Sequence, residues 1–98
     1  MKIIKRNGTE VAFDLSKIIN AITKANNEVS EDNRLSDEQI KLISKKVTAL
    51  AGDLNRAVNV EEIQDFVENH IMDQKAYAVA RKYITYRYSR ALVRKATR

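Results

Sequence analysis

Helix-breaking residues are almost absent from this chain, which has no proline and only two glycines among its 98 residues. Proline interrupts a helix interior and glycine weakens it, so long stretches of the sequence are free to be helical. Apolar residues recur at helical spacing over residues 15–25, 36–51, 60–71 and 76–95. We therefore expect one domain built mainly from four helices, the last of which turns Ala80, Ile84 and Ala91 inward.

Short polar side chains mark the expected helix starts, and a glycine marks one helix end. The expected N-terminal signals are Asp14 before the first helix, Ser36 with Gln39 as a capping box, and Asn59 with Glu62. Gly52 is expected to end the second helix, because glycine adopts the left-handed conformation just past a helix end without steric cost.

The first thirteen residues predict a β-hairpin. The dipeptide Asn7-Gly8 favours a two-residue type I′ turn, in which both central residues have positive φ. Ile3-Ile4 on one side, and Val11 with Phe13 on the other, supply the apolar flanks of this turn. Two short antiparallel strands are therefore expected to lead directly into the first helix.

A further short strand is expected near Val58 and Val60, which have alternating spacing. The predicted fold class is α+β and mostly α. It consists of a four-helix bundle capped by a small two- or three-stranded antiparallel sheet.

Three cations surround the expected hairpin and the start of the first helix: Lys5, Arg6 and Lys17. A hairpin that runs into a helix N-terminus brings backbone N–H groups and the positive end of the helix dipole into the same volume. This arrangement predicts an anion-binding site. Lysines on an edge hairpin also discourage aggregation, so solvated surface charges are the alternative interpretation.

The net charge of +5 is unevenly distributed along the chain. Residues 75–98 contain no acid and eight cations, which are Lys75, Arg81, Lys82, Arg87, Arg90, Arg94, Lys95 and Arg98. Such asymmetry favours a polyanionic partner, either a nucleic acid or a polyphosphate ligand.

The chain has no cysteine and one histidine. Disulfides, thiolate zinc sites and a cysteine nucleophile are excluded, and we predict no metal site and no catalytic residue. The longest apolar run near the start is Ile3-Ile4, far too short for a signal peptide or a membrane span. We therefore expect a cytoplasmic protein without a membrane partner.

Two alternatives follow from the basic last helix. Arg87, Arg90 and Arg94 are spaced i, i+3 and i+7 on one helix face, as in a helix that contacts DNA, so a nucleic-acid-binding helical module is one alternative. A plain helical interaction module is the other, and it leaves the clustered N-terminal cations unexplained.

Two blocks of the sequence carry a resemblance to a known family. The first contains Lys5-Arg6-Asn7-Gly8, Phe13-Asp14 and Lys17-Ile18, and the second contains residues 60–68 and 80–90. Together they resemble the ATP-cone, the N-terminal allosteric nucleotide-binding domain of ribonucleotide reductases. The sequence of residues 83–87 is most similar to that of the anaerobic ribonucleoside-triphosphate reductases. Residues 1–98 would then be one ATP-cone at the N-terminus of a longer reductase.

The resemblance implies a nucleotide site. Lys5 and Arg6 match phosphate-contacting residues, residues 11–17 match a segment that wraps the nucleotide, and Lys17 matches a phosphate-binding lysine. The implied contact set is Lys5, Arg6, Val11, Ala12, Phe13, Asp14, Lys17, Ile18, Val60, Gln64, Arg87 and Arg90. The departure is Asn7, where the family usually has Asp, and we expect no loss of binding from it because both residues suit the turn.

The function that the resemblance implies is allosteric. The domain would bind ATP or dATP, with Mg²⁺ held by the phosphates, and control the overall activity of an attached C-terminal catalytic domain without being catalytic itself. The full-length protein could form a homo-oligomer, and nucleic acid is not the expected partner. A related transcriptional repressor of reductase genes also contains an ATP-cone, joined to a Cys-rich zinc ribbon that this cysteine-free chain lacks.

Overall fold

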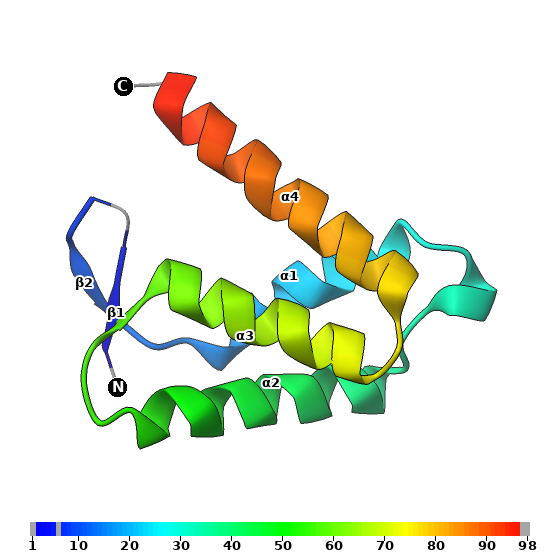
Figure 1. The fold of residues 1–98 in the computed structure, drawn as a ribbon, viewed down its shortest axis with the longest axis horizontal. Coiled ribbons are helices and arrows are strands. Elements are labelled where there is room, and N and C mark those ends of the chain that lie inside the picture. The colour runs from blue at the N-terminus through cyan, green and yellow to red at the C-terminus, as the bar shows by residue number, and fades with distance from the viewer. Residues whose placement is uncertain (1, 6, 97–98) are drawn as a thin grey trace.

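The computed structural model describes residues 2–5 and 7–96, and it has the predicted mostly helical fold with a small sheet. Figure 1 shows the elements in chain order. These are β1 (Lys2–Ile4), β2 (Glu10–Ala12), α1 (Leu15–Asn27), the 3₁₀ turn η1 (Glu31–Asn33), α2 (Asp37–Asp53), β3 (Val58–Asn59), α3 (Val60–Asp73) and α4 (Tyr77–Ala96).

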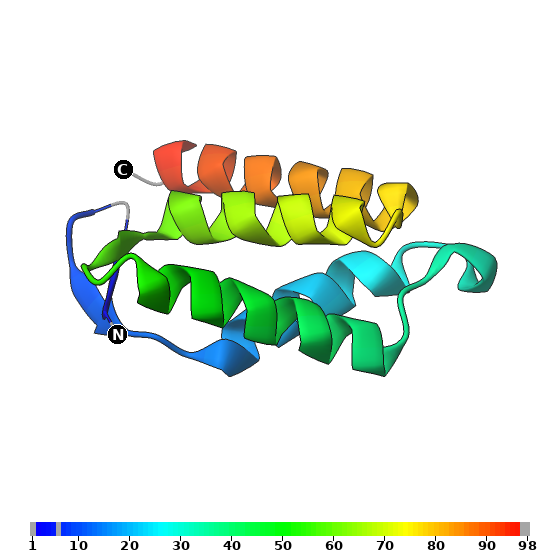
Figure 2. The ribbon, with the colours of Figure 1, turned by 60° about the horizontal axis from the view of Figure 1, so that its bottom comes forward.

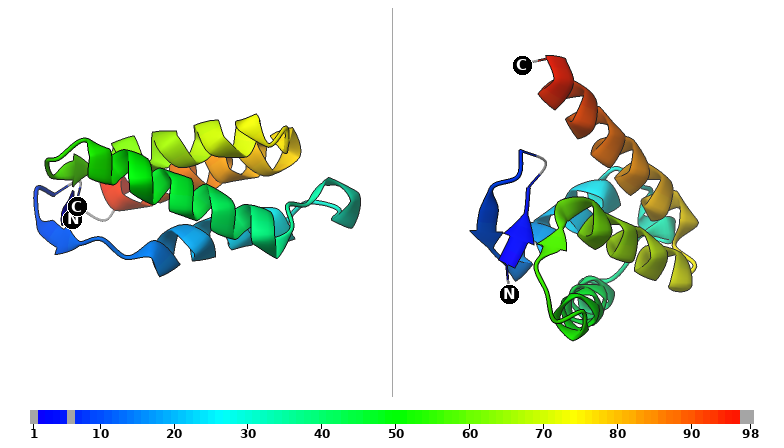
Figure 3. Two further views of the ribbon diagram at one scale, coloured as in Figure 1. Left: turned by 90° about the horizontal axis from the view of Figure 1, so that it is seen from below. Right: turned by 60° about the vertical axis from the view of Figure 1, so that its left-hand side comes forward.

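The helices form two layers. Figure 2 shows α3 and α4 side by side above α1 and α2, and α1 also contacts α4 while α2 contacts α3. The sheet lies at one end of the bundle and η1 lies at the other, as both panels of Figure 3 show. Any site built on the sheet is therefore remote from the η1 end.

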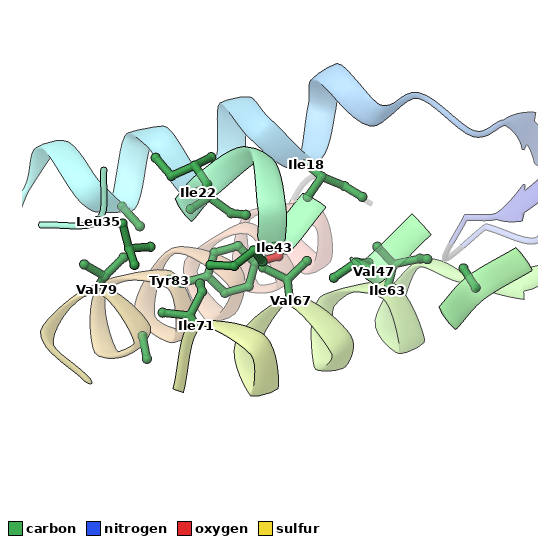
Figure 4. Close-up of a cluster of buried hydrophobic side chains, with 14 of the residues drawn as sticks. Ile18, Ile22, Leu35, Ile43, Val47, Ile63, Val67, Ile71, Val79 and Tyr83 are labelled. Carbon is green, nitrogen blue, oxygen red and sulfur yellow. The ribbon is translucent and has the colours of Figure 1, made fainter. Parts of the chain in front are cut away.

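The core is made of branched aliphatic side chains from the inward faces of all four helices (Figure 4). Ile22, Ile43 and Ile71 are almost completely buried. The expectation for α4 was partly wrong: Ala80 is buried, but Ile84 is 41% exposed and Tyr83 takes the inward position. Val79, Ala80 and Tyr83 form the inward face of α4, and the side chain of Ala91 lies outside the described residues.

The sheet is mixed, whereas a purely antiparallel sheet was expected. Its strand order is β2-β1-β3, with β1 antiparallel to β2 and parallel to β3. The topology explains the direction of β3. Helix α1 leaves from the end of β2, and α2 returns the chain to that same end of the sheet (Figure 1), so β3 runs alongside β1 in the same direction.

The expected type I′ turn is wrong. The Gly8 N–H donates to the Lys5 carbonyl at 2.9 Å and the Lys5 N–H donates to the Thr9 carbonyl at 2.9 Å, which makes a three-residue hairpin loop. Gly8 has φ +84°. The Asn7 side chain instead accepts a hydrogen bond of 3.0 Å from the Thr9 N–H, a local contact typical of asparagine in turns.

The predicted caps of α1 and α2 are confirmed. Asp14 accepts a hydrogen bond from the Ser16 N–H, and both bonds of the Ser36–Gln39 capping box are present. The Asn59–Glu62 signature is half present: the Asn59 side chain makes no capping hydrogen bond to α3, but the Asn59 backbone N–H donates to the Glu62 carboxylate.

Helix α2 passes through Gly52 and ends at Asp53, so the predicted stop is also wrong. Asn55 takes the left-handed conformation instead, with φ +55°. Asparagine tolerates this conformation better than other non-glycine residues, which lets the helix continue past the glycine.

Lys75 also has a left-handed backbone, with φ +61°, at the end of α3. The Lys75 N–H donates to the Met72 carbonyl at 2.8 Å and the Ala76 N–H donates to the Ile71 carbonyl at 3.3 Å, the two bonds of a Schellman motif. Lysine is strained in this conformation. The variant Lys75→Gly should therefore raise the free energy of unfolding by about 0.5–1 kcal/mol, measured by urea denaturation.

The control for this variant is Lys45→Gly in the middle of α2, where the same substitution should lower the free energy of unfolding by about 1 kcal/mol. A loss of stability in both variants would contradict the assignment of strain to Lys75.

Candidate functional site

The sheet brings the start of α3 next to the hairpin. Ile4 of β1 is in parallel register with Asn59 of β3. The residues that follow, Lys5 and Val60, therefore leave the sheet at the same edge. Lys5 is exposed, and Val60 is partly buried against the core. Two predicted site residues that are far apart in the sequence thus lie close together in the fold.

The other end of β2 leads into α1 through predicted site residues. Val11 and Phe13 are half-buried and pack against the core, whereas Ala12 is exposed. These residues and Lys5 lie at opposite ends of a short hairpin, because Ala12 pairs with Lys2 and a three-residue strand spans about 10 Å. A ligand with separate base and phosphate ends could contact both ends of the hairpin.

Asp14 holds the first turn of α1. Its carboxylate accepts hydrogen bonds from the Ser16 hydroxyl at 2.6 Å and from the Ser16 N–H at 3.0 Å. The pKa of Asp14 is lowered mainly by the hydroxyl bond, with smaller contributions from the N–H bond and from the charge of Lys17. Asp14 is therefore an anion committed to the helix cap.

The N-termini of α1 and α3 differ in charge. The first turn of α1 contains no acid, and Lys17 is exposed beside it, while the next residue, Ile18, is buried in the core. The first turn of α3 contains Glu61 and Glu62. The positive end of the α1 dipole is therefore the more suitable of the two for an anion.

Gln64 carries a buried acceptor without a partner. Its side-chain oxygen, Oε1, is buried and makes no hydrogen bond within the described part of the chain. Gln64 lies one turn after Val60 on α3 and shares its helix face. A buried polar atom without a partner costs about 1–3 kcal/mol. Such an atom at a predicted site residue is suited to a hydrogen-bond donor on a ligand.

Arg87 is held by acids of α3. Its Nη1 lies 2.7 Å from a carboxylate oxygen of Asp65 and 2.7 Å from one of Glu68, and its Nη2 donates to the Glu61 carbonyl at 3.3 Å. Burial opposes its charge, but hydrogen bonds to Glu68 and Asp65 outweigh burial and raise the pKa of the guanidinium. Arg87 therefore joins α4 to α3, and a phosphate contact would require it to leave these partners.

Replacing Arg87 by methionine should lower the free energy of unfolding by about 2 kcal/mol, because Glu68, only 17% exposed, would lose its cation. Thermal or urea unfolding measures this. Lys82→Met on the same helix is exposed and should change stability by less than about 0.5 kcal/mol. Equal effects of the two variants would show that the Arg87 ion pairs do not stabilise the domain.

Some predicted site residues cannot be placed. Arg6 and the side chain of Arg90 lie outside the described residues. Two surface pockets, of about 470 Å³ and 280 Å³, are lined by residues of other segments, and neither includes a residue of the predicted set.

Analysis of the sequence missed the acids that hold Arg87. Asp65 and Glu68 are spaced i, i+3 on α3 and face a helix whose charged residues are all basic, and this pairing of opposite charges was a usable signal. It also missed the grouping of Arg34, Lys75 and Arg81 around the larger pocket, because these residues come from three separate segments.

Two kinds of feature are absent from the described residues, a membrane-spanning helix and a metal-binding cluster. None of the helices in this part of the chain is long and apolar enough to cross a membrane. Residues 2–5 and 7–96 contain no group of three or more His, Cys, Asp or Glu side chains that could hold a metal ion.

Comparison with known proteins supports the resemblance. The chain is 40% identical to a vitamin B12-dependent ribonucleoside-diphosphate reductase of Thermoplasma acidophilum, over 95% of this chain and 12% of that protein. It is 34% identical to the anaerobic ribonucleoside-triphosphate reductase of Haemophilus influenzae, over 94% of this chain and 13% of that protein. It is 32% identical to a ribonucleoside-diphosphate reductase alpha subunit of Chlamydia trachomatis, over 96% of this chain and 10% of that protein.

The chain thus spans only about a tenth of the length of these relatives. The family described as the ATP cone domain matches residues 1–92, which is nearly all of the sequence. The chain belongs to the ATP-cone family, whose role in ribonucleotide reductases is allosteric regulation through bound nucleotide.

Proposed function

We propose that this chain senses the ratio of dATP to ATP and controls a ribonucleotide reductase of which it forms a part. The match to the ATP cone over residues 1–92, in a chain whose relatives are reductases, is the observation that carries the proposal. The proposed site lies between the hairpin, the first turn of α1 and the N-terminal half of α3.

The charges around the proposed site indicate where the phosphate end of the nucleotide binds. We assign the phosphates to Lys5 and Lys17, because the glutamates in the first turn of α3 would repel them and the first turn of α1 contains no acid after its cap residue, Asp14. Arg6 is also assigned to the phosphates, because it matches a phosphate-contacting residue of the family. Each charge-assisted hydrogen bond contributes about 1.5–3 kcal/mol.

The base and sugar are assigned to the α3 side of the site. The partly buried side chain of Val60 provides apolar contact. Oε1 of Gln64 is buried in the chain without ligand, so in the proposal the Gln64 side chain turns toward the nucleotide and accepts a hydrogen bond from one of its amino or hydroxyl groups. The residues present therefore fit an adenine nucleotide, and Mg²⁺ would be carried by its phosphates rather than by a cluster of protein carboxylates.

The two nucleotides must affect the reductase differently. A ligand shifts an equilibrium only if it binds two states of the assembly with different affinity. In the proposal, ATP permits activity and dATP suppresses it in a cytoplasmic enzyme, through the attached catalytic domain and its oligomeric arrangement. The sequence of residues 83–87 supports an anaerobic, triphosphate-reducing class, although the relatives include three kinds of reductase.

Isothermal titration calorimetry tests the proposal. ATP and dATP, each with Mg²⁺, should bind the chain with measurable heat, and a short DNA duplex at physiological salt should not. Tight, steeply salt-dependent duplex binding without an ATP signal would instead support a nucleic-acid module. The ion pairs of Arg87 count against that alternative, since they remove one of three arginines from the face that DNA would contact.

Replacing Gln64 by methionine, which has similar length, should have opposite effects on stability and binding. The chain without ligand should gain about 1 kcal/mol in the free energy of unfolding, because the unpartnered acceptor is removed. Affinity for ATP should fall about tenfold. Urea unfolding and calorimetry measure the two effects. A loss of stability with unchanged affinity would show that Gln64 is a structural residue.

A further inference from the structure

A second polar site lies at the end of the molecule opposite the hairpin. An open pocket of about 470 Å³ is lined by the end of η1 and the segment after it, the start of α2, the turn from α3 to α4 and the start of α4. Figure 1 shows this turn and η1 on the right and the hairpin on the left. The pocket contains none of the residues that we assign to the nucleotide.

The lining of the pocket is basic. Three of its side chains are cations, Arg34, Lys75 and Arg81, and Asp32 is the single acid among its eleven lining residues. Each cation comes from a different segment, so helical periodicity does not account for their meeting. Three cations and one acid around one concave surface give it a positive potential, which favours an anionic ligand.

Hydrogen bonds hold several of the lining side chains in place, including Arg34 and Gln74. Arg34 donates from Nε to the Val29 carbonyl at 2.8 Å and from Nη2 to the Asn27 carbonyl at 3.2 Å. Oε1 of Gln74 accepts from Nε2 of Gln39 at 3.3 Å, which leaves the amide nitrogen of Gln74 as a donor. A fixed guanidinium and a fixed amide lose little conformational entropy when a ligand binds.

The start of α4 adds to the positive potential. Residues 76–78 line the pocket, and the first turn of α4 contains no acid that would balance the helix dipole. Arg81 lies one turn further along the same helix and also lines the pocket. Cations at the positive end of a helix are unfavourable on their own and favourable around a bound anion.

We propose that this pocket binds a small phosphate-bearing ligand, separately from the nucleotide site beside the sheet. Charge-assisted hydrogen bonds from the guanidinium groups, the Lys75 amine and the Gln74 amide would hold the phosphate oxygens. Free phosphate chains and phosphate esters share this chemistry. The inference is independent of the proposed function, because it uses no residue of that site.

Titration of the ¹⁵N-labelled chain with pyrophosphate, followed by NMR, tests the inference. Amide signals of residues 32–35 and 74–81 should shift in a saturable way. In Arg81→Gln, the dissociation constant should rise at least tenfold, equivalent to about 1.4 kcal/mol. The matched control is Lys82→Gln, which removes the neighbouring exposed cation that does not line the pocket. Its dissociation constant should stay within twofold of the wild-type value.

A second arm separates the two sites. In the double variant Lys5→Gln with Lys17→Gln, pyrophosphate should still shift residues 74–81 with wild-type affinity. Comparison with glucose 6-phosphate distinguishes free phosphate chains from phosphate esters. Shifts confined to the hairpin, equal effects of the Arg81 and Lys82 variants, or shifts caused only by an acidic peptide would overturn the proposal. The spectra also report whether each variant is folded.

Discussion

Replacement of both Lys5 and Lys17 by glutamine is expected to weaken ATP binding at least about a hundredfold, equivalent to about 3 kcal/mol, with no loss of folded structure. Both side chains are exposed, so they contribute little to stability. Each amine is assigned a charge-assisted contact with the phosphates, and glutamine cannot replace the charge. Calorimetry with ATP and Mg²⁺ measures the affinity, and circular dichroism measures the fold.

The control for this pair is the double variant Lys41→Gln with Lys45→Gln on α2. It changes the net charge by the same amount as the first double variant. The two lysines that it replaces are exposed and lie far from the hairpin in the sequence. Its ATP affinity should stay within about threefold of wild type, since distant surface charges are screened beyond about 8 Å at physiological ionic strength. Equal losses of affinity in the two double variants would show that ATP binding depends only on the net charge of the domain.

Replacing Asn26 by alanine is expected to have the largest effect on stability, a loss of about 3 kcal/mol in the free energy of unfolding. The Asn26 side chain is buried and forms two hydrogen bonds with one residue of the following loop. Its Nδ2 donates to the Leu35 carbonyl at 3.0 Å, and its Oδ1 accepts from the Leu35 N–H at 2.7 Å. Alanine would leave both Leu35 backbone groups without a partner. The expected loss is a large fraction of the total free energy of unfolding, which is typically about 5–15 kcal/mol.

The neighbouring residue provides the matched control. Asn27 is exposed, and only its backbone carbonyl takes part in the loop, as the acceptor for Arg34. Asn27→Ala should therefore change stability by less than about 0.5 kcal/mol. Urea denaturation of both variants measures the difference. Similar losses in the two variants would mean that the loop after α1 is not anchored by the buried amide.

Helical structure was predictable where local signals agree. The caps at Asp14 and Ser36 were read correctly because the residue type and the spacing of the following apolar positions point to the same start. The end of α2 was not predictable in this way. Gly52 is a strong local stop signal, but a helix can continue when a later residue, here Asn55, accepts the left-handed conformation.

Long-range features were less accessible to prediction. The parallel pairing of β1 with β3 depends on where α2 returns the chain, which no local pattern encodes. The same holds for Arg87, whose spacing on α4 suggested a ligand contact while its partners lie on α3. Of the candidate site, the placement of Lys5 and Lys17 at exposed positions was predictable, and the buried acceptor of Gln64 required the packed structure.

The parallel pairing of β1 with β3 also has a consequence for the order of folding. It joins Ile3 to Val58, so the sheet closes only after most of the intervening chain has been brought together. Helices form from local contacts within about a microsecond, whereas pairing of distant strands must wait for loop closure. The surface that we assign to the nucleotide needs this pairing to set Lys5 beside Val60. We therefore expect the domain to gain its helices first and to complete the surface proposed for the nucleotide last.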